Sequence, residues 1–142
     1  MLESFELALL SPDGVRILVN ASTTESTDGR VSLVLEKADV CSGVFTGYDA
    51  IDALRLLRRK VERLGWRVLC NGARRDAWAS GMARDMSNGF RLYINLEHGK
   101  PARDVADTFD EAPSELIGTC EEQRAHYERW LAESAAQRMQ QQ

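Results

Sequence analysis

The chain has 142 residues, of which 44% are hydrophobic and 28% charged, the composition of a folded globular protein. Its length suits one domain, and we expect residues 1–136 to form that domain and residues 137–142 to be a frayed tail. No apolar run approaches the roughly 18 residues of a membrane span. The acidic start also lacks the pattern of a signal peptide, so we expect a cytoplasmic protein that does not contact a membrane.

Charge is divided into blocks along the chain. Residues 1–45 hold 3 basic and 7 acidic residues, residues 46–100 hold 11 and 6, and residues 101–142 hold 4 and 9. A basic middle between acidic ends is typical of a recognition surface. The alternative is that the blocks neutralise one another in the folded chain, and both interpretations remain open.

The first third of the sequence predicts three antiparallel strands. FELALL (5–10) and VRILVN (15–20) flank Ser-Pro-Asp-Gly, a turn sequence, and therefore predict a hairpin. The Ser/Thr-rich residues 21–29 predict a loop. VSLVLE (31–36) alternates apolar and polar residues and predicts the third strand of a meander.

A helix is expected over residues 46–64. Thr46 is its predicted N-cap, with Asp49 completing a capping box, and Gly65 its predicted left-handed end. The preceding Gly43-Val-Phe-Thr-Gly47 lacks a phosphate-loop pattern and predicts a flexible approach to the helix. One apolar stripe follows the helix at spacings of three and four, formed by Tyr48, Ile51, Leu54, Leu57, Val61 and Leu64.

The remaining elements complete an α+β fold. Residues 66–70 predict a buried strand, FRLYINL (90–96) a clear strand, and VADTF (105–109) an edge strand. Thr119 and Glu122 form the capping box of a last helix. Its expected apolar stripe is Cys120, Tyr127, Trp130 and Leu131. We predict an antiparallel sheet, meander plus central strands, covered by two main helices.

Catalytic chemistry has little support in the sequence. The two histidines and three cysteines show no metal-ligand spacing, so neither a metal nor a cofactor is expected. Cys70 ends a predicted strand and His98 follows the next one, which leaves a Cys/His enzyme or a small ligand-binding domain as an alternative. Against it, Cys70 continues the apolar alternation of Trp66 and Val68 and therefore predicts a core thiol. His126 is expected at a half-exposed place on the last helix.

Nucleic-acid binding is a further alternative. The first helix carries basic residues away from its apolar stripe, namely Arg55, Arg58, Arg59, Lys60 and Arg63, and Arg67, Arg74 and Arg75 follow. The acidic flanks, a sequence pI near 5.2 and the lack of an aromatic platform motif beside these arginines favour a solvated face instead.

Residues 71–88 (NGARRDAWASGMARDMSN) permit two interpretations. In the first, Trp78, Met82 and Met86 close the edge of the sheet from a short helix, while Arg74 and Arg75 hold the turn. Ser80 alternatively caps a shorter helix that begins at Gly81. In the second interpretation, the segment is a presented loop, since Arg, Trp and Met are enriched at protein interfaces.

Residues of the second half resemble a known kind of protein. L-C-N-G-A-R-R-D, S-G-M-A-R-D-M and E-E-Q-R-A-H-Y-E-R-W-L (121–131) resemble segments of small single-domain bacterial proteins of toxin–immunity loci, over about residues 46–133. The resemblance implies a cytosolic immunity protein that neutralises a cognate toxin domain by stoichiometric binding.

The acidic segment after residue 103 is the preferred partner-binding surface. Seven carboxylates fall within residues 104–122 around a proline-containing loop, and we expect them to occupy a basic cleft of the partner. The candidate partner-binding residues are Asp104, Asp107, Asp110, Glu111 and Glu115, with Arg74, Arg75 and Trp78 as a second set. The oligomeric state is left open.

Overall fold

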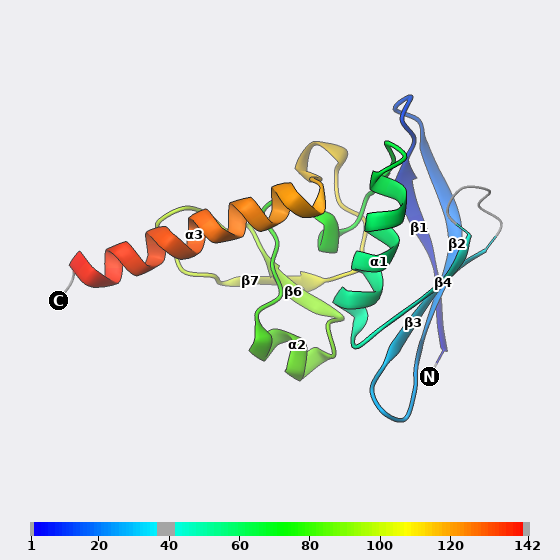
Figure 1. Ribbon diagram of the computed structural model, residues 1–142, viewed down its shortest axis with the longest axis horizontal. Coiled ribbons are helices and arrows are strands. Elements are labelled where there is room, and N and C mark those ends of the chain that lie inside the picture. The colour runs from blue at the N-terminus through cyan, green and yellow to red at the C-terminus, as the bar shows by residue number, and fades with distance from the viewer. Residues whose placement is uncertain (1, 37–41, 141–142) are drawn as a thin grey trace.

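A computed structural model describes residues 2–36 and 42–140 of the chain (Figure 1). Its described elements form a five-stranded antiparallel sheet, a second sheet of two strands and three α-helices. The α+β class expected from the sequence is confirmed. Residues 37–41, which include Cys41, lie outside the described part.

The N-terminal meander is confirmed and is longer than expected. Strand β1 (Leu2–Leu10) pairs along its length with β2 (Arg16–Glu25), and β2 pairs with β3 (Val31–Glu36). The predicted loop over residues 21–29 is wrong in its first half, because 21–25 continue β2. Ala21 and Thr23 are buried there. The small polar residues of this stretch alternate between core and solvent, which suits a strand as well as a loop.

The predicted start of the first helix is also wrong. Residues 43–47 form strand β4 (Gly43–Gly47), which pairs with β3, and the Thr46 hydroxyl lies 2.8 Å from that of Ser32. The N-cap of helix α1 (Ala50–Glu62) is Asp49, whose Oδ1 accepts from the Asp52 amide at 2.8 Å. Aspartate is as good a cap as threonine, and β-pairing claims the residues before it.

Helix α1 packs on the sheet through an apolar stripe that is shorter than predicted. Leu54, Leu57 and Val61 are buried as expected, together with Ala50 and Ala53. Tyr48 and Leu64, by contrast, are 77% and 53% exposed because they lie beyond the two ends of the helix. Gly65 has the predicted positive φ, 84°.

One of the three predicted central strands joins the large sheet and the other two form a second sheet, whereas a single sheet was expected. Strand β5 is only Arg67–Val68 and pairs with β1, so the large sheet has the order β4-β3-β2-β1-β5. Strand β6 (Arg91–Ile94) pairs with β7 (Asp104–Asp107). A 3₁₀ turn (Asn71–Ala73) and helix α2 (Gly81–Ser87) connect β5 to β6. The start of α2 at Gly81 agrees with the alternative prediction of a shorter helix that begins at this residue.

The last helix, α3 (Cys120–Gln140), begins with the predicted capping box. The Thr119 amide donates to Glu122 at 2.8 Å, and the Glu122 amide donates to the Thr119 hydroxyl at 3.1 Å. The predicted apolar stripe is wrong at Leu131, which is exposed, while Cys120, Tyr127 and Trp130 are half-buried. The helix continues through Gln140; fraying of the tail stays a prediction.

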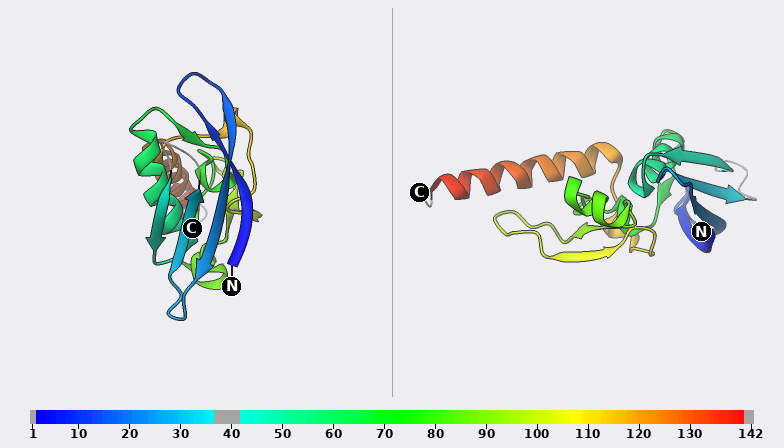
Figure 2. Two further views of the ribbon diagram at one scale, coloured as in Figure 1. Left: turned by 90° about the vertical axis from the view of Figure 1, so that its right-hand side faces the viewer. Right: turned by 90° about the horizontal axis from the view of Figure 1, so that it is seen from below.

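The elements form layers around α1. One face of the five-stranded sheet packs on α1, and β6, β7, α2 and α3 lie on the other side of that helix (Figures 1 and 2). The C-terminal half of α3 projects away from the sheet. The loop between β6 and β7 follows α3, with the Trp130 indole donating to the Lys100 carbonyl at 2.9 Å.

Candidate functional site

A groove opens where β1 and β5 separate. The two strands pair at Leu9–Leu10, after which residues 69–72 turn away and pair with residues 108–112. The gap between the first half of β1 and the chain after β7 has a volume of about 800 Å³. Cavities of this size accommodate a small ligand or a short peptide segment.

Three aromatic rings lie in this groove. Phe5 of β1 and Phe109 after β7 have ring centroids 5.3 Å apart, and Phe90 lies 6.0 Å from Phe109. All three are half-buried at the boundary between the two sheets. They offer apolar contact area that the fold leaves partly open.

The rim is acidic. Six carboxylates line the groove, namely Glu3, Glu6, Glu25, Asp107, Asp110 and Glu111, against a single arginine, Arg91. Arg91 lies 3.5 Å from Asp107, and Arg16 contacts both oxygens of Glu111, at 2.8 and 2.5 Å. The Arg16 hydrogen bonds lower the pKa of Glu111. Within residues 2–36 and 42–140, the other four carboxylates form no ion pair.

One wall of the groove is an open strand edge. Strand β5 covers β1 only at Leu9 and Leu10, and beside it Ala8 accepts a hydrogen bond from the Leu69 amide. Alternate residues of a strand direct their backbone groups to opposite sides. Ser4 and Glu6 therefore direct theirs to the same side as Ala8, where no described strand pairs with them.

The acidic residues predicted from the sequence are divided by the fold. Asp107, Asp110 and Glu111 line the groove, whereas Asp104 and Glu115 do not. The carboxylate of Asp104 accepts a hydrogen bond from the side-chain amide of Asn95 at 3.0 Å. Glu115 is exposed in a separate 3₁₀ turn, Ser114–Leu116.

The second predicted set, Arg74, Arg75 and Trp78, holds the fold together. Arg74 is buried and bonds both oxygens of Asp76 at 2.8 Å. Arg75 donates to the carbonyls of Ile117 and Glu115 at 2.7 and 2.6 Å. Arg74 therefore holds the turn as predicted, whereas Arg75 connects the segment to residues 115–117 outside it.

Trp78 and the methionines of residues 71–88 separate in the structure. Trp78 stacks on Tyr127 of α3 with centroids 4.2 Å apart, and its backbone pairs with Tyr93. Met82 and Met86 are 73% and 82% exposed, so the prediction that they close the sheet edge is wrong.

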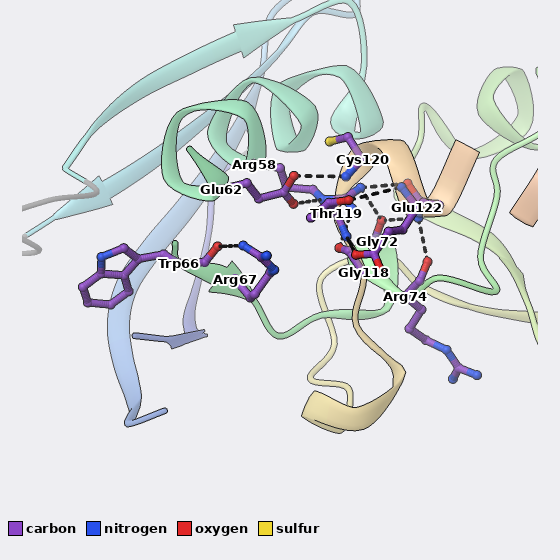
Figure 3. A network of polar contacts seen from close by, with 11 residues as sticks. Arg58, Glu62, Trp66, Arg67, Gly72, Arg74, Gly118, Thr119, Cys120 and Glu122 are labelled. Atoms are coloured by element: carbon purple, nitrogen blue, oxygen red, sulfur yellow. Dashed lines mark hydrogen bonds and ion pairs between the residues drawn. The ribbon is translucent and has the colours of Figure 1, made fainter. Parts of the chain in front are cut away.

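Arg58, predicted on the exposed basic face of the first helix, is instead buried at the centre of a polar network (Figure 3). Its guanidinium donates to the carbonyls of Gly72 and Gly118, at 3.3 and 3.1 Å, and contacts Glu62 at 3.1 Å. The network joins α1 to the 3₁₀ turn and to the start of α3. Apolar periodicity cannot reveal it, because Arg58 is a charged residue that is buried through its hydrogen bonds and not through apolar contacts.

The structure does not bring Cys70 and His98 together. Cys70 is fully buried in the hydrophobic core, as predicted, and burial raises the pKa of its thiol to about 11. His98 belongs to the loop between β6 and β7 and contacts α3. Its Nδ1 lies 3.0 Å from Glu133, and its ring centroid lies 5.2 Å from that of His126. Burial, followed by the neighbouring His98, lowers the pKa of half-buried His126. No group of three metal-ligating side chains occurs among the described residues.

Several groove residues escape sequence analysis. Phe5, Phe90 and Phe109 are distant in the chain. Glu3 precedes the first predicted strand and Glu25 lies in the predicted loop over residues 21–29, so neither is marked as a binding residue. The acidic excess of residues 1–45 is the one signal that points toward them.

No protein-family model matches this chain, and no curated protein matches it. Among the described residues, no helix combines the length and apolar character needed to cross a membrane.

Proposed function

We propose that this protein acts by stoichiometric binding to another protein, as an immunity protein that neutralises a cognate toxin domain in the cytoplasm. The observation that carries the proposal is the groove beside β1, in which an acidic rim, aromatic side chains and an open strand edge meet. Carboxylates of this number attract a basic segment and repel acidic competitors.

The partner's segment binds in an extended conformation. A strand added beside β1 bonds with the backbone groups of Ser4 and Glu6, and its basic side chains reach the carboxylates of the rim. Aliphatic side chains or stems contact Phe5 and Phe109. Main-chain bonds supply affinity in this mode, and the charges and rings supply selectivity.

The first test uses, as the candidate toxin, the C-terminal domain of the protein that the neighbouring gene encodes. We expect the two proteins to co-purify after co-expression at a one-to-one ratio. Reversal of the three groove carboxylates Glu3, Glu25 and Asp110 to lysine is expected to slow association markedly at low salt, with a smaller loss at high salt.

A matched control carries the same change of charge elsewhere. Asp13, Glu115 and Glu128 are exposed, lie outside the groove and form no side-chain ion pair with described residues. Their reversal to lysine should leave most of the binding intact. Equal losses of binding in the two triple variants would show that the groove is not the binding site. Turnover of a small molecule without any protein partner would contradict the whole proposal.

A second test addresses the strand edge. Ser4→Pro removes an amide that faces the open side while leaving the bonds between β1 and β2 in place, and an edge strand tolerates proline there. We expect this variant to fold and to bind the toxin domain weakly. Ser4→Thr keeps the amide and should bind normally; full binding by Ser4→Pro would exclude strand addition at this edge.

A further inference from the structure

A second groove lies between α1 and α3 and shares no residue with the acidic one. It has a volume of about 690 Å³. Arg55 and Arg59 line it from α1, Arg63 lines it from the C-cap of that helix, and Arg124 lines it from α3. Trp78 is also part of the lining. Four guanidinium groups from two elements thus surround one hollow.

The acidic side chains of this groove do not neutralise its arginines. Glu62 is occupied by Arg58 and by the Cys120 amide, at 3.1 and 3.0 Å. Glu121 is the other carboxylate in the lining, and it forms no ion pair with a described residue. Within residues 2–36 and 42–140, Arg55, Arg59 and Arg124 likewise form no ion pair.

Arg55 is the residue that makes this arrangement costly. Its side chain is half-buried, and burial, followed by Arg84, lowers its pKa; Arg59 acts in the same direction, while Cys120 and Asp52 act against it. A cation that loses water without gaining a partner is destabilised. An anion bound between the arginines would restore the lost interactions.

We propose that this groove binds a small, multiply charged anion of the pyrophosphate class, held by Arg55, Arg59 and Arg124. Guanidinium groups match phosphate oxygens in two-point hydrogen bonds, and several of them suit a ligand with more than one charge. A long polyanion fits less well, since the carboxylates of Glu62 and Glu121 lie in the lining beside the arginines and the chain carries a net charge of −4.

The test is calorimetric titration of the full chain with pyrophosphate at low ionic strength. We expect saturable one-to-one binding that weakens as salt is added. Arg55→Gln and Arg59→Gln should each weaken binding by about tenfold or more, the loss typical of a charge-assisted hydrogen bond. Arg55→Lys keeps the charge but not the two-point geometry, and should also bind more weakly than the parent.

Arg103→Gln is the matched control, because Arg103 is exposed and lies outside the groove. Its binding should equal that of the parent chain, and circular dichroism of each variant checks the fold. Absence of saturable pyrophosphate binding at millimolar concentration would overturn the proposal, as would equal weakening in Arg103→Gln. If a single-stranded DNA 12-mer binds more tightly than pyrophosphate and displaces it, the proposal of a small anion is wrong and the ligand of this groove is a nucleic acid. None of these outcomes depends on a toxin partner.

Discussion

The side chain of Arg58 donates a 2.7 Å hydrogen bond to the side-chain oxygen of Gln123, which joins the middle of α1 to the first turn of α3. Gln123 in turn donates to the carbonyls of Gly72 and Arg74, both at 2.9 Å. The two buried side chains therefore connect the second layer of the molecule to the helix that packs on the sheet.

Arg58→Ala is expected to lower the free energy of unfolding by about 3–5 kcal/mol, because the change leaves the largely buried Glu62 side chain without its cationic partner and removes a donor from Gln123 and from two carbonyls. Chemical denaturation measures the loss. Arg59→Ala, on the exposed side of the same helix, should change the free energy by less than about 0.5 kcal/mol. Similar losses in the two variants would contradict the central role of Arg58.

The cap of α1 provides a second prediction. Asp49 caps the helix and also accepts two hydrogen bonds from Arg84, at 2.6 and 2.9 Å. Asp49→Ala should lower the free energy of unfolding by about 0.5–2 kcal/mol or more, and Asp49→Asn by less, since asparagine still caps. Thr46→Ala should have little effect. A larger loss at Thr46 than at Asp49 would place the cap at the earlier residue.

Leu57 and Leu64 test the extent of the apolar stripe on α1. Leu57 is fully buried and Leu64 is 53% exposed. Leu57→Ala should cost about 2–5 kcal/mol of unfolding free energy, and Leu64→Ala well under half of that. Thermal or urea denaturation of the two variants gives the comparison, and a loss below about 0.5 kcal/mol for Leu57→Ala would mean that the wrong face was assigned to the sheet.

Cys70 should resist alkylation in the folded protein. Its thiol is buried and has a pKa of about 11, so the thiolate that reacts is scarce and inaccessible near neutral pH. Labelling of a Cys41→Ala chain at pH 8, followed by mass spectrometry, should modify half-buried Cys120 before Cys70. Fast labelling of Cys70 would revive the alternative of a Cys/His enzyme.

The same thiol predicts a loss of stability in alkaline solution. The folded chain holds the Cys70 proton up to about pH 11, whereas the unfolded chain releases it near pH 9.0. The contribution of this thiol to the free energy of unfolding is therefore complete below pH 9 and declines as the pH rises toward 11. Between pH 8 and 11, the free energy of unfolding of Cys70→Ala should therefore fall less steeply than that of the parent chain. Parallel slopes would show that Cys70 does not ionise on unfolding.

The sequence by itself determined the local elements. Alternating residues predict β3 and β6, and the Ser-Pro-Asp-Gly turn between two apolar runs predicts the hairpin of β1 and β2. The Thr119–Glu122 pair predicts the start of α3, and Gly65 predicts the end of α1. These features depend on neighbours within about four positions, so the signal is contained in a short window. Where two local preferences compete, as at residues 21–25 and at Thr46, pairing with a distant strand decided the outcome.

The candidate sites were decided by tertiary structure. The sequence predicts a recognition surface that includes Asp107, Asp110 and Glu111, but it does not point to the aromatic rings or the strand edge that lie beside them. It placed Arg58 among solvent-exposed cations, although the structure buries it against Gly72 and Gly118. Charge and periodicity describe one segment at a time. A groove or a buried polar network, by contrast, exists only when segments distant in sequence are packed together, because its free energy arises from contacts between them.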